Sequence, residues 1–333
     1  MLSCMRHLGR HRHGFSRVFP APALPAVAAA PTTSRSRVEP RLLIVTPARD
    51  EGRHLRAVVE AMIAQERRPD LWVVVDDGST DDSMAILDGV RHVAPFMRVA
   101  RTSPRGDGAE DRLASGAAPR AFNVGLAAFG GESFDFIGKI DADVSLPREY
   151  FRVLLERFGR EPSLGIAGGT ILERRRHGDW RPVSVPSHHV PGALKLYRRE
   201  CFERIGGVQS TLAWDTIDEM YARMYGFTTR SYGDLEVLHH KRTGAAAGVI
   251  RGKARHGACA WIAHYPLYFV VLRAMKLGMT RPAVISGLAF LCGYAKAACT
   301  GVPRVSDAAF RRHVRRELAR RFPLSASTLR SRH

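Results

Sequence analysis

The stretch RLLIVTPARDEGRHLRAVVEAMIAQERRPDLWVVVDDGST, residues 41–80, contains two apolar runs separated by a segment with helical spacing. The runs RLLIVTP (41–47) and LWVVV (71–75) have the unbroken apolar character of buried strands. Between them, apolar residues recur at helical intervals in HLRAVVEAMIAQ (54–65). A strand, a helix and a second strand at these lengths predict parallel pairing, with the helix packed on the sheet.

The same alternation continues along the chain. Helical patterns follow at 81–90 and 119–129, and FDFIGKIDAD (134–143) has the character of a central strand. We therefore expect an α/β fold with a Rossmann-like, mostly parallel central sheet and helices on both faces.

Polar clusters follow three of the predicted strands. TPARDE (46–51), VDDGST (75–80) and IDAD (140–143) all lie at strand ends. Because ligands bind beyond the carboxyl ends of the strands in such sheets, the three clusters are expected to converge on one rim and form a site.

Asp141 and Asp143 are separated by one residue, so in an extended backbone their carboxylates point to the same side. Like charges held so close repel each other unless a hard divalent cation, such as Mg²⁺ or Mn²⁺, lies between them. Chance alone produces an Asp-x-Asp in a chain of this length, and a solvated turn is the simpler interpretation of the pair taken by itself.

The net charge of +19 is unevenly distributed over the 333 residues. Residues 1–40 hold six Lys or Arg and one acid, residues 41–236 hold 27 against 29, and residues 237–333 hold 18 against two. The excess charge thus lies outside the middle of the chain and predicts contact with an anionic surface, either a membrane or a polyanion. The five cysteines show no Cys-x-x-Cys pattern, which argues against a zinc site or a disulfide framework.

Two terminal regions flank the predicted α/β domain of residues 41–245. Residues 1–40 are expected to be a disordered basic extension, with a targeting peptide as the alternative. Residues 246–333 are expected to be a basic, partly apolar, helical region that associates with a membrane. Its apolar run 283–295 is too short to cross a bilayer that needs about 20 residues, so a surface-lying or shallowly inserted segment fits the runs 266–272 and 283–295 better.

The end of the C-terminal region carries an apolar stripe in a field of arginines. Phe310, Val314 and Leu318 recur on one side of SDAAFRRHVRRELARRF (306–322), a pattern suited to anionic lipid headgroups. The alternative is an ordinary amphipathic helix docked on the α/β domain.

Residues 41–245 resemble the family 2 glycosyltransferases with the GT-A fold. The resemblance rests on residues 41–80, on FDFIGKIDADVSLPREYFRVLLERF, and on LGIAGGTILE, HHVPGALKLYRRECFERIGGV, WDTIDEMYARMYGFTTRSY and VLHHKRTG in that order. Two departures are Asp50, where an Asn is common, and Trp214-Asp215, where the family usually has Glu-Asp.

The resemblance implies an enzyme that transfers a sugar from a nucleoside diphosphate sugar to a hydroxyl of a glycan or lipid-linked acceptor. Inversion and dependence on Mn²⁺ or Mg²⁺ are the expected features, in polysaccharide or glycoconjugate biosynthesis. The expected location is cytoplasmic, in peripheral contact with an anionic membrane at its inner face, without a specific nucleic-acid partner. Two alternatives are a transferase that loads sugar onto polyprenyl phosphate and a non-catalytic polyanion-binding protein on the same fold.

Nucleotide-sugar contacts are expected from both the strand ends and the basic segment after residue 238. Asp76 and Asp77 can accept hydrogen bonds from a base or ribose, although the same loop also suits a helix N-cap. By resemblance, Thr46, Pro47 and Glu51 flank the base, with a plain helix start as the alternative. The remaining candidates are Asp141, Lys139, Lys241 and Arg242, the last two as partners of phosphate oxygens.

Asp141, Asp143, His239 and His240 are the candidate metal ligands. Asp215 is the candidate general base, because inverting transfer needs a carboxylate that takes the acceptor hydroxyl proton. Asp218 and Glu219 share a helical face with Asp215, so either is an alternative base, and the three together could also form a solvated acidic stripe.

Overall fold

The computed structural model describes residues 39–102, 115–129, 133–174, 178–241, 248–279 and 282–321. The first elements are β1 (Leu42–Ala48), α1 (Gly52–Ile63), β2 (Leu71–Asp76), α2 (Ser83–Val90), β3 (Met97–Arg101), α3 (Ala117–Phe129), β4 (Phe136–Ile140), β5 (Val144–Ser145) and α4 (Tyr150–Arg160). They are followed by β6 (Leu164–Arg174), β7 (Trp180–Pro182), β8 (Leu194–Arg198), α5 (Arg199–Arg204), α6 (Trp214–Met224) and β9 (Thr228–His239). The last helices are α7 (Gly248–Ile262), α8 (Leu267–Gly278), α9 (Ile285–Cys299) and α10 (Ala308–Arg321).

The described strands form one sheet in the order β3-β2-β1-β4-β8-β6-β9-β5, with β7 paired to β6. β1, β2, β3 and β4 are parallel to their neighbours within this group, as predicted. In contrast, β8 runs antiparallel to both β4 and β6, and β5 runs antiparallel to β9. The α/β fold is confirmed, but a mostly parallel sheet is not, because the sheet is mixed, with β6 and β9 also paired in parallel.

The mixed half of the sheet has a local cause. β6, β7 and β8 follow one another with no helix between them in the residues that the structure describes. A parallel connection needs a crossover of a dozen or more residues, usually a helix, whereas direct connections favour antiparallel pairing.

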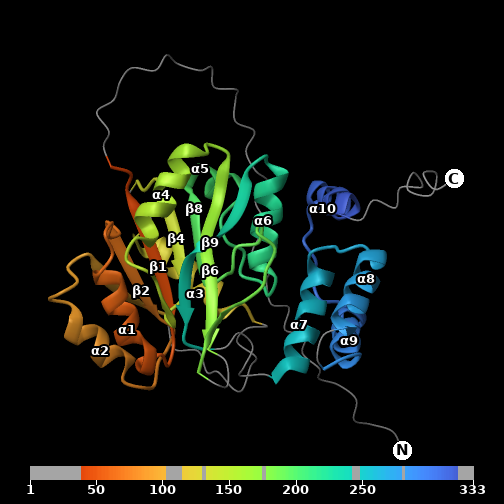
Figure 1. Cartoon of the computed structure of the whole chain (residues 1–333), viewed down its shortest axis with the longest axis horizontal. Helices are drawn as coiled ribbons and strands as arrows, with labels where there is room; N and C mark the ends of the chain where they lie inside the picture. The colour runs from red at the N-terminus through yellow and green to blue at the C-terminus, as the bar shows by residue number, and fades with distance from the viewer. Residues whose placement is uncertain are drawn as a thin grey trace, which may run out of the picture. The chain divides into compact units, whose positions relative to one another are not determined.

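Alternating side chains of the sheet contribute to two cores. Leu43 and Val45 of β1 face a cluster that includes α3, α5 and α6, whereas Leu42 and Ile44 face a cluster that includes α1, α2 and α4. Figure 1 shows α1 and α2 beside β1 and β2. Helices therefore cover both faces of the sheet, as the sequence predicts.

Helix α10 packs on the α/β domain through the stripe that was predicted to face lipid. Phe310, Val314 and Leu318 are fully buried, and the Phe310 ring lies 4.5 Å from the Tyr221 ring of α6. The lipid-facing interpretation of this stripe is therefore wrong, and the docked amphipathic helix is what the structure contains. None of the described helices is long and apolar enough to cross a membrane.

Helices α7 and α9 approach each other closely at two glycines. A Cβ atom on Gly257 of α7 would lie 2.0 Å from the Phe290 carbonyl oxygen, and one on Gly293 of α9 would lie 1.9 Å from that of Ala254. Backbone atoms cannot move aside as a side chain can, so both positions exclude a side chain.

We expect Gly257→Ala to lower the free energy of unfolding by about 1–3 kcal/mol, because the added methyl group would push α7 and α9 apart. Gly252→Ala on the same helix is the matched control. Its Cβ would meet open space, so the better helix propensity should raise stability by about 0.5–1 kcal/mol. Urea unfolding of both variants measures the difference. Equal effects of the two substitutions would contradict the close contact.

Candidate active site

The carboxyl ends of β1, β2 and β4 meet at one edge of the sheet. Because these strands are parallel and adjacent, Ala48 is in register with Asp76, and the Asp77 amide donates to the Ala48 carbonyl at 2.8 Å. The predicted convergence of strand-end residues on a single rim therefore has its backbone basis in these pairings.

Hydrogen bonds hold together the loops that follow β1 and β2. The carboxylate of Asp50 accepts from the Thr80 amide at 2.7 Å, and the Ser79 amide donates to buried Asp76 at 3.0 Å. Asp50 adopts a left-handed backbone with φ of 52°, a conformation that Asp and Asn tolerate better than most residues. Asp77 accepts from the Thr102 hydroxyl at 2.7 Å. Hydrogen bonds to Asp50, Asp76 and Asp77 thus hold the two loops in place, and Asp76 lies at the end of β2.

Thr46 and Pro47 differ in how far they are buried near this rim. Thr46 is fully buried in β1, and its hydroxyl accepts from the Trp72 indole N–H at 2.9 Å. Pro47 is half-buried, one residue before the end of β1. The structure places the Thr46 side chain in the core rather than with the strand-tip side chains.

Glu51 immediately precedes α1, and its two carboxylate oxygens have different surroundings. Its Oε1 lies 2.6 Å from the Lys241 ammonium, whereas its buried Oε2 has no hydrogen-bond partner among the described residues. Burial, together with the negative charges of Asp143 and Asp141, raises the pKa of Glu51 to about 7, although Lys241 opposes the shift. Glu51 and Lys241 thus lie within the electrostatic reach of the Asp-x-Asp segment.

Asp143 and His239, two of the candidate metal ligands, lie side by side. Asp143 Oδ2 lies 3.4 Å from His239 Nε2, and both side chains are largely buried. Burial opposes ionisation of Asp143, but the hydrogen bond and charge of His239 hold the pKa of its carboxyl below the usual value. The buried Nδ1 of His239 has no hydrogen-bond partner in the described part of the chain.

His240 meets Asp143 through its backbone amide, which donates to the Asp143 carbonyl at 2.9 Å, but its ring has other partners. Its Nε2 lies 2.8 Å from the Ser145 hydroxyl, and its ring stacks on His54 with centroids 5.4 Å apart. The described residues contain no group of three or more His, Cys, Asp or Glu side chains arranged to hold a metal ion. Asp143 supplies a carboxylate, which suits both Mn²⁺ and Mg²⁺, and His239 supplies an imidazole, which suits Mn²⁺ better than Mg²⁺.

Lys139 connects the Asp-x-Asp segment to the next loop. Its almost fully buried ammonium contacts Asp141 Oδ1 and donates to the Gly192 carbonyl at 2.9 Å. The same ammonium lies 5.0 Å from the centroid of the Trp214 ring. Lys139 therefore pairs with Asp141 and fixes the backbone at Gly192, which lies against Trp214 and Asp215 of α6.

Lys195 organises a buried acidic cluster beneath the first turns of α6. Its ammonium donates to Asp218 at 2.8 Å, to Glu219 at 3.1 Å and to the Asp215 carbonyl oxygen at 2.6 Å. Asp218 also accepts from the Tyr197 hydroxyl at 2.5 Å. Although burial opposes ionisation of Glu219, Lys195 and His189 lower the pKa of that carboxyl to about 2.

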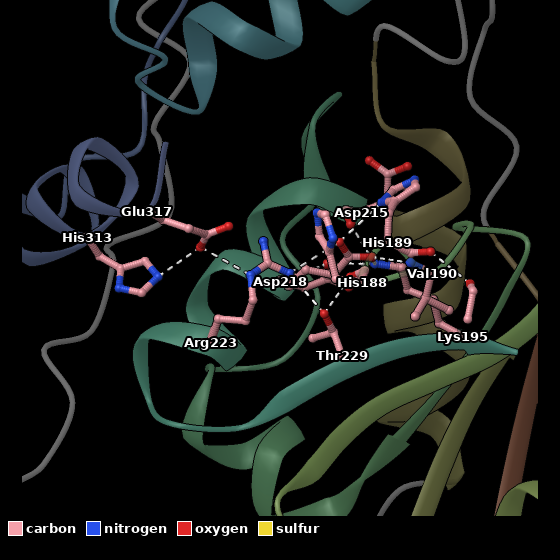
Figure 2. A network of polar contacts seen from close by, with 12 residues as sticks. His188, His189, Val190, Lys195, Asp215, Asp218, Arg223, Thr229, His313 and Glu317 are labelled. Atoms are coloured by element: carbon pink, nitrogen blue, oxygen red, sulfur yellow. Dashed lines mark hydrogen bonds and ion pairs between the residues drawn. The ribbon is translucent and has the colours of Figure 1, made fainter. Parts of the chain in front are cut away.

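Asp215 differs from the other two acids of α6. Its side chain is half-exposed, whereas Asp218 and Glu219 are each 2% exposed. A Cβ atom on Gly192 would lie 3.3 Å from Asp215 Cβ and 2.8 Å from the Trp214 ring. Since Lys139 binds the Gly192 carbonyl, Asp215 lies across one backbone segment from the Lys139–Asp141 pair. Figure 2 shows Asp215 together with Lys195 and Asp218.

The same network extends to α10. Arg223 lies 3.6 Å from Glu219 and 3.1 Å from Glu317 of α10, and it donates to the Thr229 hydroxyl at 2.9 Å (Figure 2). Burial opposes ionisation of Glu317, but Arg223 holds the pKa of its carboxyl below the usual value. The C-terminal helix is thus tied by charge to the helix that carries Asp215.

Sequence reasoning identified most of these residues but missed their pairing. Lys195 and Tyr197 lie two apart on β8, which places both on one face of a strand where they meet Asp218. The lysine within the apolar run ALKLY could have indicated a buried ammonium that needs an acidic partner. Arg242, a predicted phosphate partner, lies outside the described residues.

The α/β fold is similar to that of GT-A glycosyltransferases, and a family model shows the family. A family model described as Glycosyl transferase family 2 matches residues 43–214, just over half of the chain. The chain therefore belongs to glycosyl transferase family 2.

Two curated relatives match part of the chain. It is 27% identical over 236 residues to the O-antigen biosynthesis protein RfbC of Myxococcus xanthus, which covers 68% of this chain and 18% of that protein. It is 32% identical over 129 residues to the beta-monoglucosyldiacylglycerol synthase of Synechocystis sp., which covers 38% of this chain and 24% of that protein. The match thus spans no more than 24% of either relative.

Two solved structures show a similar fold. A mannosyltransferase from Pyrobaculum calidifontis, in complex with GDP-Man and Mn²⁺, has a TM-score of 0.50 and 17% identity, covering 85% of this chain and 81% of that one. GalNAc-T7, with UDP, GalNAc and Mn²⁺, has a TM-score of 0.52 and 12% identity, covering 87% of this chain and 59% of that one.

We expect Lys195→Met to lower the free energy of unfolding by about 3–5 kcal/mol, because Asp218 and Glu219 would remain buried without their cation. The control is Arg199→Met, which removes an exposed ion pair with Glu203 and should change stability by less than about 0.5 kcal/mol. Chemical denaturation compares the two. A loss below about 1 kcal/mol for Lys195→Met would show that the cluster does not depend on this ammonium.

Proposed function

We propose that this protein transfers a sugar from a nucleoside diphosphate sugar to a hydroxyl acceptor, with inversion at the anomeric carbon. The observation that carries the proposal is the single rim that joins Asp143 and His239, the Lys139–Asp141 pair and the half-exposed Asp215. Membership of the family supports it, as do the GDP-Man bound in one of the similar structures and the UDP and GalNAc bound in the other.

The donor is proposed to lie along the strand tips. Asp76 and Asp77, at the end of β2, face the base or ribose as hydrogen-bond acceptors, with Pro47 and Glu51 beside them. Lys241 is 45% exposed and lies next to Glu51, so its ammonium can bind phosphate oxygens. Asp143 and His239, with Asp141 beside them, would hold a divalent cation, which stabilises the charge that develops on the leaving diphosphate.

Asp215 is proposed as the general base. It takes the proton of the acceptor hydroxyl while the hydroxyl oxygen forms its bond to the anomeric carbon and the electron pair of the breaking bond leaves with the diphosphate. Asp218 and Glu219 are poorly suited to this role because Lys195 holds both in a buried cluster. The Trp214 ring beside Asp215 offers a flat surface for a sugar.

We expect Asp143→Ala to lose metal-dependent binding of nucleoside diphosphates, because it removes the carboxylate that pairs with His239. Isothermal titration of UDP, GDP, CDP and TDP, each with and without Mn²⁺, measures this effect. Asp88→Asn, at an exposed acid of α2, is the control and should bind as the parent does. The proposed cation position would be refuted by an Asp143→Ala protein with the parent's manganese dependence.

Asp215→Asn should bind the nucleotide with unchanged affinity but transfer sugar about 10²–10⁴-fold more slowly, because an amide cannot accept the hydroxyl proton. The measurement is turnover of the donor identified by the binding screen. Transfer at the parent rate would exclude Asp215 as the base.

A further inference from the structure

The outer surfaces of α8 and α9 expose large apolar side chains. Nine of the thirteen large hydrophobic residues that are exposed within the described part of the chain belong to residues 267–288. They are Leu267, Tyr268, Val271, Leu272, Met275, Met279, Val284, Ile285 and Leu288. We refer to these nine residues as the apolar hairpin face. An exposed patch of this kind marks an interaction site rather than ordinary surface.

The helices cannot turn this face inward. On α8, Phe269, Val270 and Ala274 already pack into the core. A Cβ atom on Gly287 of α9 would lie 2.4 Å from the Ala274 carbonyl oxygen, so the two helices are in close backbone contact. Leu267, which is 66% exposed, recurs with Val271 and Met275 at intervals of four on the opposite side of α8.

Charge restricts what can cover this face. Residues 248–306 contain no Asp or Glu and eight Lys or Arg. Arg273, Lys276 and Lys296 are exposed on α8 and α9 themselves. A second copy of the chain would bring like charges together across the interface, whereas an anionic lipid surface supplies both apolar chains and opposite charge.

The length of the helices limits how they can contact a bilayer. A helix of 12 residues, such as α8, is about 18 Å long, whereas the hydrocarbon core of a bilayer is about 30 Å thick. The helix can therefore lie in the interface but cannot span the membrane.

We propose that the apolar hairpin face inserts into the interface of an anionic lipid bilayer, with Lys276 and Lys296 at the headgroups. This surface is distinct from the sugar-transfer rim, and its test does not depend on the proposed function. It also differs from the α10 stripe of Phe310, Val314 and Leu318, which packs against the protein.

The test is flotation of the full chain with vesicles of phosphatidylcholine mixed with phosphatidylglycerol and with vesicles of phosphatidylcholine alone. The parent should float with the mixed vesicles and less with the neutral ones. Met275→Asp/Leu288→Asp should lower partitioning into the mixed vesicles at least about tenfold, because two inserted side chains become charged. Val93→Asp, at a position 46% exposed outside the hairpin, is the matched control and should float as the parent does.

A second variant tests the charges without altering the apolar residues. Lys276→Gln/Lys296→Gln should abolish the preference for phosphatidylglycerol, and its unfolding midpoint should match that of the parent. Parent-like flotation of Met275→Asp/Leu288→Asp would overturn the proposal. The proposal would also be overturned if the parent did not float with either vesicle and instead formed a dimer that Met275→Asp/Leu288→Asp dissociates. The face would then bind a second copy of the chain.

Discussion

Two buried lysines on neighbouring strands impose the constraint on which the candidate active-site rim depends. Lys139 of β4 and Lys195 of β8 are register partners, and both are almost fully buried. Like charges opposite each other destabilise a sheet, and an unpaired buried ammonium costs several kcal/mol. Each lysine therefore requires an acid, and both lie near the Trp214 ring, at 5.0 and 5.4 Å from its centroid. The acids that meet this need are supplied by the Asp-x-Asp segment and by α6.

The two lysines pair with some acids of the rim and leave others without a lysine partner. Asp141 is neutralised by Lys139, so Asp143 is left to pair with His239. Likewise, Lys195 binds Asp218 and Glu219, so Asp215 alone among the acids of α6 reaches the half-exposed first turn. The same acidic composition would be a solvated stripe if no lysine lay beneath it. Burial and strand register, rather than residue type, thus decide which acids are held in buried ion pairs and which are accessible.

The sequence predicted those features that depend on local pattern. The alternating strands and helices and the strand-tip position of Asp76 and Asp143 follow from periodicity and from the geometry of parallel strands. Features that depend on partners far along the chain were not predictable. The antiparallel β8 and the burial of the Phe310 stripe are set by what packs against them, and the Lys195–Asp218 pair joins residues on separate elements. A strand or a helical stripe has the same sequence pattern whichever partner it meets.

The central claim is that the acids at neighbouring strand tips enclose a cation and a diphosphate in one pocket. Anomalous diffraction at the manganese edge, from crystals of the full chain grown with Mn²⁺ and a nucleoside diphosphate, tests it most directly. We predict a manganese peak beside Asp143 and His239, the base near Asp76, and Asp215 facing the same space. A manganese peak away from Asp143, or a nucleotide bound on a different face from Asp215, would contradict it.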